Sequence, residues 1–423
     1  MSESFYESAL EKLRRFGHTR KPVARLHTGD SQGPIILTHR REHSTLEPVY
    51  ITLKNVDEAK ELGGFPNSDF DDGKLGVDFL PIPQQFSAAV TPDPHPFSTQ
   101  ICNALRAYIY GDSDFVTSYK DVLNKLRFPM TLTVLEAEDV TVSKGKPLII
   151  KDDGHGQPFA VVFRKITVEP GGQIIWQGAQ GSLVAQELIY QQPTGGVSLE
   201  SLLSSGDGPE QNFVSVGAPG GDGGNGGSPE KSADGPDGNP GKDNKNSCAR
   251  AATDGEKGVD GADGGKGSDG ENGGDGNEVN VTVDSISGIV FVGSGGGTGG
   301  KGGNGGRGGD GGKGGDGGAA TSHCGAGKGK DGGKGGDGGY AGKGGDGGNG
   351  KNVYFTYKSG SPSFVLKPAT GTGGKGGDGG VGGTGGKGGT NGGTSGATGK
   401  TRDGGKTGLT GAPGQIFVNG KQL

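Results

Sequence analysis

The sequence lacks three features that define common classes of protein: a long apolar run, a basic patch and a large set of cysteines. A membrane-spanning helix needs roughly 18 or more consecutive apolar residues, and none occurs, so no membrane span is predicted. The net charge is −6, and lysine alternates with aspartate instead of clustering, which argues against a nucleic-acid partner. Three cysteines in 423 residues do not make a disulfide scaffold.

Glycine, by contrast, is abundant and periodic, and most of the 97 glycines follow residue 206. Residues 301–317 read KGGNGGRGGDGGKGGDG, and the same phase runs through 331–349 and 372–390. A period of three fits neither an α-helix nor a strand, but it fits the polyproline-II helix, with a rise of about 3.1 Å per residue. Because the N–H groups of that helix lack internal partners, the pattern predicts a bundle of polyglycine-II helices joined by backbone hydrogen bonds.

The glycine-rich sequence allows three other interpretations. Glycine-rich chain is usually a flexible linker, but the constant phase of three long runs favours order. A collagen helix would fit residues 255–276, where every third residue is glycine, yet that stretch has none of the proline that collagen needs. Phosphate-loop patterns recur by composition alone and carry no weight.

The fold class predicted from these patterns is an α+β N-terminal domain with solenoid- or sandwich-like strands, followed by a polyglycine-II helical bundle interrupted by β-hairpins. The predicted domains are 1–129 (α+β), 130–205 (β-rich attachment region) and 206–423 (glycine-rich bundle). Apolar spacing predicts helices at 3–16, 96–111 and 114–128, and alternating apolar residues predict β-hairpins at 277–293 and 352–368.

The irregular stretches that interrupt the glycine repeat are the predicted contact loops for a partner. Cys248 and Cys324 both lie where the triplet phase breaks; free thiols are expected there, and a bridge between them is the open alternative. The Lys and Asp residues of the repeat are expected to form a solvated face that fixes register. The residues predicted to contact a partner are Arg250, His323, Cys324, Lys328, Lys330 and Tyr340.

No set of residues indicates catalysis. Asp69, Asp71 and Asp72 resemble part of a calcium loop, but the spacing and the closing glutamate are missing. A hairpin turn explains Asp152, Asp153 and His155, and the charged run from His39 to His43 is expected to be a solvated edge or an anion-binding patch. Without a nucleophile–base pair or a complete metal set, the prediction is no enzyme, no cofactor and no metal.

The order of strands, then GGQIIWQG, then long GGX runs resembles the glycine-rich tip adhesins of bacteriophage long tail fibres, over residues 130–423. The resemblance implies a β-rich attachment part and distal loops that bind a bacterial surface receptor. Springtail antifreeze proteins are similar in the glycine helix alone, but the charged faces here argue against ice binding.

The predicted function is therefore a non-catalytic, rigid attachment module that binds a cell-surface receptor or glycan. The alternatives are a self-assembling structural protein that forms filaments or crystals, and a toxin or effector whose activity lies in residues 1–200. The first residues, MSESFYESALEKLRRFG, predict a charged amphipathic helix rather than a signal peptide. Synthesis in the cytoplasm is expected, followed by incorporation into a virion or release without a classical signal.

Overall fold

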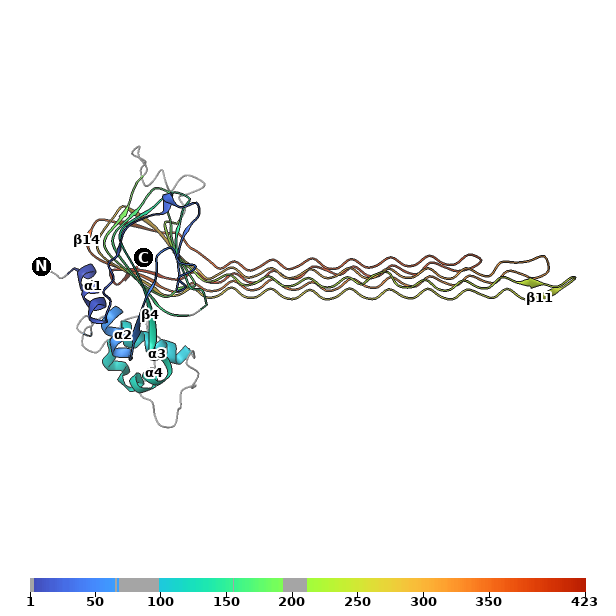
Figure 1. Ribbon diagram of the computed structural model, residues 1–423, viewed down its shortest axis with the longest axis horizontal. Coiled ribbons are helices and arrows are strands. Elements are labelled where there is room, and N and C mark those ends of the chain that lie inside the picture. The colour runs from blue at the N-terminus through green and yellow to red at the C-terminus, as the bar shows by residue number, and fades with distance from the viewer. Residues whose placement is uncertain (1–3, 65–66, 68–98, 155, 193–210) are drawn as a thin grey trace.

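The computed structural model describes residues 4–64, 67, 99–154, 156–192 and 211–423. Two β-sheets form a broad base, a small group of helices covers one of them, and a long, straight rod of glycine-rich chain projects from the base (Figure 1). Within the described residues, no helix is both long enough and apolar enough to cross a membrane.

The larger sheet has nine strands, and nearly all of its neighbours are parallel. Its order is β1-β4-β6-β8-β12-β14-β16-β17, and β3 lies antiparallel beside β4. Among the strands in the described part of the chain, β17 is the other antiparallel member of this sheet, against β16. The strands are β1 (Val23–His27), β3 (Val49–Leu53), β4 (Met130–Val142), β6 (Phe159–Val168), β8 (Gly181–Tyr190), β12 (Val279–Ser287), β14 (Val353–Gly360), β16 (Ile416–Val418) and β17 (Lys421–Gln422).

The second sheet has six parallel strands in the order β15-β13-β9-β7-β5-β2. From β4 onward the chain passes alternately between the two sheets, so each circuit adds one strand to each of them. Successive circuits stack in register, as a parallel sheet requires. The strands are β2 (Ile35–Leu37), β5 (Leu148–Lys151), β7 (Ile174–Gln177), β9 (Phe213–Val216), β13 (Ile289–Ser294) and β15 (Ser363–Leu366).

The main hydrophobic core lies between the two sheets. Side chains of a strand point alternately to opposite faces, and in β6 the odd-numbered residues Phe159, Val161 and Phe163 face the second sheet. Trp176 of β7 is fully buried among them. Each large apolar side chain buried in this way contributes about 1.5–3 kcal/mol, so the stacked circuits supply the apolar burial that the glycine runs cannot.

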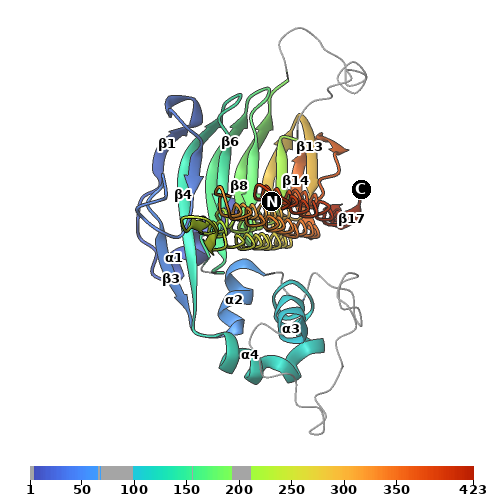
Figure 2. The same cartoon turned by 90° about the vertical axis from the view of Figure 1, so that its right-hand side faces the viewer.

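The opposite face of the larger sheet is covered by helices (Figure 2). Ala160 and Val162, the even-numbered residues of β6, pack there in a second core with Leu123 and Tyr119. Asp284 of β12 fixes the start of the first helix, because its carboxylate accepts hydrogen bonds from Ser4 Oγ at 2.6 Å and the Phe5 amide at 2.7 Å. The helices are α1 (Phe5–Arg15), α2 (Val56–Gly63), α3 (Thr99–Tyr110) and α4 (Lys120–Arg127), with short 3-10 turns η1 (Thr28–Asp30) and η3 (Ser113–Tyr119).

The rod consists of three excursions of the chain, each leaving the second sheet and returning to the larger one. They connect β9 to β12, β13 to β14, and β15 to β16. Together they form six extended segments that lie side by side (Figures 1 and 2). The segments, which we call the rod, are 217–240, 252–276, 295–318, 327–350, 371–390 and 393–414.

Backbone hydrogen bonds hold the rod together. The amide of Gly306 donates to Gly265 O at 2.9 Å, that of Gly339 to Gly306 O at 2.8 Å, and that of Gly380 to Gly339 O at 2.9 Å. These bonds recur every three residues along the rod. Burial of the backbone requires such partners, and glycine allows the close approach: a Cβ on Gly306 would lie 2.1 Å from Gly227 O.

Side chains of the repeat complete the hydrogen bonding at the rod surface. The outward amide of Lys301 donates to Asp222 Oδ1 at 2.8 Å, and that of Asn304 donates to Asn225 Oδ1 at 2.9 Å. The two residues of such a pair are 79 positions apart between the first and third segments, 74 between the second and fourth, and 63 between the fourth and sixth. Many of the aspartates therefore have a structural role that a solvated face does not describe, since their carboxylates accept a backbone amide from another segment of the rod.

The predicted fold class is wrong. Most of the regular structure is a large, mainly parallel mixed sheet with few helices, not an α+β domain followed by a polyglycine-II helical bundle. Throughout 211–423 no helix is assigned; the glycine runs are extended excursions from the sheets. The predicted hairpins at 277–293 and 352–368 are also absent, because β12 pairs with β8 and β14, whereas β13 pairs with β9 and β15.

We expect the rod to loosen in acid. The Thr384 amide and the Arg307 guanidinium lower the pKa of Asp310 to about 2. Amides of the neighbouring segment likewise lower the pKa values of Asp254, Asp260, Asp316 and Asp331. Because these values lie below those of the unfolded chain, near 3.8, their stabilisation is complete above that pH and is lost as the pH falls toward 2.

Hydrogen exchange of rod amides, corrected for intrinsic rates, measures this effect between pH 5 and pH 2. The triple variant Asp310→Asn, Asp316→Asn, Asp331→Asn keeps the side-chain acceptors and removes the charges. It should therefore show a smaller loss of protection than the unaltered protein. Equal acid sensitivity of the two proteins would show that these carboxylates do not cause the effect.

Candidate functional site at the end of the rod

The far end of the rod is a small, irregular structure that we call the tip, comprising residues 241–251 and 319–326. It lies at the end of the molecule opposite the sheets (Figure 1). The two-stranded antiparallel pair of β10 (Lys242–Asp243) and β11 (Cys248–Arg250) forms the turn of the first excursion. The turn of the second excursion packs beside it, so the tip is built from two chain reversals.

A disulfide joins these two reversals. Cys248 and Cys324 are bonded, with Cα atoms 4.9 Å apart, and close a loop of 76 residues. The expectation of free thiols is therefore wrong, and the alternative of a bridge is confirmed. Both cysteines lie where the triplet repeat stops, because the chain reverses direction there. The reversals of the first two excursions lie side by side at the tip, which brings the two cysteines within bonding distance.

Asp243 fixes the second reversal. Its carboxylate accepts hydrogen bonds from Thr321 Oγ1 and from the amide of His323, the latter at 3.2 Å. The Thr321 hydroxyl in turn accepts from the Cys324 amide at 3.1 Å. Cys324 is buried, with 4% of its surface exposed, whereas Cys248 is exposed. These contacts hold the tip backbone in one conformation and leave its outer side chains in solvent.

The structure brings three of the six predicted contact residues together at the tip. Arg250, His323 and Cys324 lie there, and the first two are exposed. Lys328 and Lys330 follow directly on the rod; both contact Asp254, through the Lys328 amide at 2.8 Å and Lys330 Nζ at 2.9 Å.

Tyr340 belongs to a different part of the surface. It lies partway along the rod, is 58% exposed, and its ring lies 4.5 Å from the Arg402 guanidinium. This cation–π pair crosses from the fourth segment to the sixth and stabilises the contact between them. Tyr340 is therefore not part of the tip.

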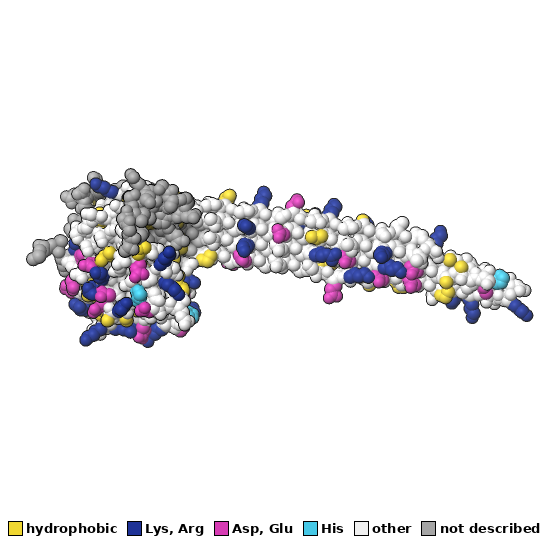
Figure 3. Space-filling view, turned by 90° about the horizontal axis from the view of Figure 1, so that it is seen from above, with side chains coloured by type: hydrophobic (Ala, Val, Ile, Leu, Met, Phe, Trp, Pro, Cys, Tyr) yellow, Lys and Arg dark blue, Asp and Glu magenta, His cyan; other side chains and the backbone are white. Residues whose placement is uncertain are grey.

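The tip presents more positive than negative charge. Lys242, Lys245 and Arg250 are exposed on its first reversal, and Asp243 is the carboxylate among them. The Asp243 carboxylate accepts hydrogen bonds from the Thr321 hydroxyl and the His323 amide. Figure 3 shows Lys, Arg and His side chains at this end of the rod, with acidic and apolar side chains among them. Sequence reasoning missed Asp243, Lys242 and Lys245, although their position in a phase break next to Cys248 marks them as part of the same turn.

The other candidate residues that the structure describes lie far from the tip. Asp69, Asp71, Asp72 and His155 fall outside the described residues. Asp152 and Asp153 lie next to His39 at one end of the second sheet, which joins two clusters that the sequence presented as separate.

Comparison with known protein families, with curated proteins and with solved structures finds no match to this chain. The geometry of the rod and its tip is therefore the basis for a proposed function.

Proposed function

We propose that this protein is a non-catalytic attachment module in which the sheets form the base and the rod carries the tip to a partner. The observation that carries the proposal is the disulfide-closed tip at the end of a rod whose segments are cross-linked by backbone hydrogen bonds every three residues. A partner that binds the tip would meet a surface already ordered, so little conformational entropy would be lost on binding.

The disulfide supports a role outside a reducing compartment. Structural disulfides persist in oxidising surroundings and are rare in reducing cytosol. The Cys248–Cys324 bond is located at the tip, at the greatest distance from the base (Figure 1). This position fits a protein whose tip works at a cell surface.

The charge of the tip indicates the class of partner. The exposed Lys242, Lys245 and Arg250 favour a receptor or glycan that carries carboxylate, phosphate or sulfate groups, because such anions accept charge-assisted hydrogen bonds from these side chains. The rod below the tip pairs many of its charges, as Lys313 does with Asp316 at 2.9 Å. Binding is therefore expected at the tip and not along the rod.

The double variant Lys245→Ala, Arg250→Ala tests the proposal by binding to whole cells and to an array of anionic glycans. We expect at least a tenfold loss of affinity, because each charge-assisted contact contributes about 1.5–3 kcal/mol. The matched control is Lys343→Ala, Lys375→Ala, which removes two exposed rod cations and should bind as the unaltered protein does. Equal loss in both variants, or in neither, would contradict tip binding.

A further inference from the structure

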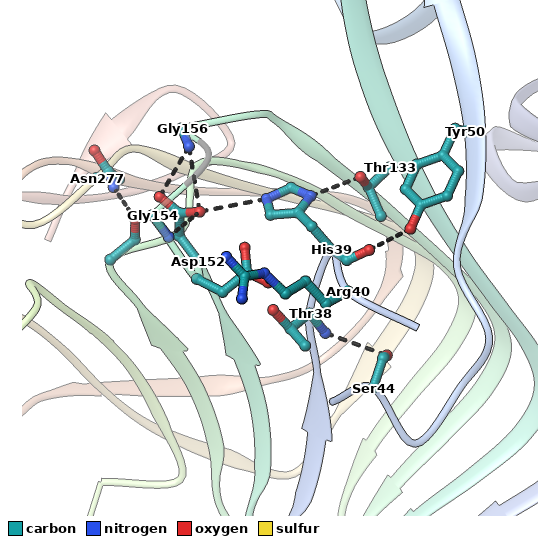
Figure 4. A network of polar contacts seen from close by, with 12 residues as sticks. Thr38, His39, Arg40, Ser44, Tyr50, Thr133, Asp152, Gly154, Gly156 and Asn277 are labelled. Atoms are coloured by element: carbon teal, nitrogen blue, oxygen red, sulfur yellow. Dashed lines mark hydrogen bonds and ion pairs between the residues drawn. The ribbon is translucent and has the colours of Figure 1, made fainter. Parts of the chain in front are cut away.

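A second cluster of ligating side chains lies at one end of the smaller sheet, far from the tip. β2 and β5 are parallel, with Leu37 paired to Ile150. Continuing that register by two residues sets His39 beside Asp152, so both side chains emerge at the same sheet end (Figure 4). The pairing of two strands more than 100 residues apart in sequence thus joins an imidazole to the Asp152–Asp153 pair.

The three side chains are close enough to share one ion. His39 Nε2 lies 3.5 Å from Asp152 Oδ1. One ligand atom from each of His39, Asp152 and Asp153 lies within 4.8 Å of the others. His39 is 2% exposed, and the side chains of Asp152 and Asp153 are 18% and 14% exposed.

Surrounding residues fix the orientation of the imidazole and of one carboxylate. His39 Nδ1 is 2.6 Å from Thr133 Oγ1, and the ring stacks on Phe159 with centroids 3.9 Å apart. Asp152 accepts hydrogen bonds from the Gly154 amide at 3.2 Å and from the Gly156 amide at 3.2 Å. Metal-binding histidines almost always donate their other ring N–H to a neighbouring oxygen, and ligating carboxylates are also hydrogen-bonded.

We propose that His39, Asp152 and Asp153 bind one divalent transition-metal ion. His39 Nε2 and one oxygen of each carboxylate are the ligands, and the Nδ1 proton is donated to Thr133 Oγ1. One nitrogen and two carboxylate oxygens suit Zn²⁺ or Mn²⁺. Arg40 Nε lies 3.4 Å from an oxygen of Asp153, and a divalent ion would add further positive charge beside the two mostly buried carboxylates.

A hollow of about 390 Å³ adjoins His39 but not the two aspartates. Besides His39, it is lined by Arg40, Arg41, Glu42, Tyr50, Thr131 and Gln157. Three protein ligands leave room for water or for an oxygen of an anionic group, and Arg40 lies where it can contact such a group. The site also ties the loop after β2 to the turn after β5. It is independent of the tip, so the two proposals stand or fall separately.

Equilibrium dialysis and calorimetry of the chelator-treated full chain with Zn²⁺, and separately with Mn²⁺, test the site. We expect one tightly bound ion per chain, with binding lost in His39→Gln and in Asp152→Asn. Thr133→Val removes only the partner of Nδ1 and should weaken binding by about 10–100-fold. The control is His27→Gln, which alters the His27–Asp30 pair (2.8 Å) elsewhere on the surface and should leave binding unchanged.

Replacement of Zn²⁺ by Co²⁺ supplies a second readout, because visible absorption bands report nitrogen–oxygen coordination in the unaltered chain without any substitution. Bands that disappear in Asp153→Asn would support the site even if His39→Gln does not fold. The proposal would be overturned if no stoichiometric ion binds, or if binding survives both His39→Gln and Asp152→Asn in folded protein. The cluster would then consist of two ionic contacts, His39 with Asp152 and Arg40 with Asp153.

Discussion

Gly306→Ala is expected to destabilise the rod along most of its length. Gly306 lies in the third segment, which donates to and accepts from its neighbours, and the new Cβ would lie 2.1 Å from Gly227 O. The first segment and the third would have to separate locally, which breaks the bond from the Gly226 amide to Asn304 O (2.8 Å) and the bond from the Arg307 amide to Ser228 Oγ (2.9 Å). Overpacking of this kind costs about 1–3 kcal/mol, and we expect hydrogen exchange of rod amides to accelerate roughly 5- to 150-fold.

Gly224→Ala is the matched control, because a Cβ at Gly224 would meet nothing within 4 Å. Both residues are glycines of the same repeat, and both variants add one methyl group. Hydrogen exchange followed by mass spectrometry resolves the rod from the sheets. Equal protection in Gly306→Ala and Gly224→Ala would show that close backbone contact does not hold the rod together.

Reduction of the Cys248–Cys324 disulfide is expected to free the tip while leaving the base folded. A cross-link that closes a loop of 76 residues stabilises the folded state by about 2–4 kcal/mol, chiefly by restricting the unfolded chain. We expect the amides of residues 241–251 and 319–326 to exchange at least tenfold faster after reduction. Proteolysis should then cleave at the tip before it cleaves the sheets.

The double variant Cys248→Ser, Cys324→Ser separates this effect from other actions of the reductant. It should behave like the reduced protein, and reductant should have no further effect on it. If the tip of the double variant stays as protected as that of the oxidised protein, the contacts of Asp243 with Thr321 and His323 are sufficient to order the tip.

Local patterns in the sequence predicted individual helices better than they predicted how the strands pair. The predicted helices at 3–16 and 96–111 correspond to α1 and α3, because amphipathic spacing is a local property. The fold class was wrong because the pairing of strands is not local: β12 lies beside β8 although residues 191–278 separate them. At Gly288 (φ +93°) the chain turns from one sheet into the other, and nothing in the residues around that turn distinguishes this from a hairpin.

The same difference applies to the candidate sites. The break in the repeat located the tip cysteines, but their pairing depends on which excursions are neighbours. The alternation of lysine and aspartate can be read from the sequence. The role of aspartate as a hydrogen-bond acceptor cannot, because its donor amide lies in another segment, 74 or 79 residues away. His39 and Asp152 were each noticed, yet only the register of β2 and β5 joins them.

Between two facing segments of the rod, each donor residue and its acceptor are separated by the same number of positions in the sequence. This constant separation restricts how the length of the rod can change during evolution. Adding one Gly-Gly-X unit to a single segment would move every aspartate beyond it to the outward amide three residues along. The backbone hydrogen bonds recur every three residues, so whole units preserve them, whereas an insertion or deletion of one or two residues would break them. Among evolutionary relatives, rod lengths should therefore fall in discrete steps instead of varying by single codons.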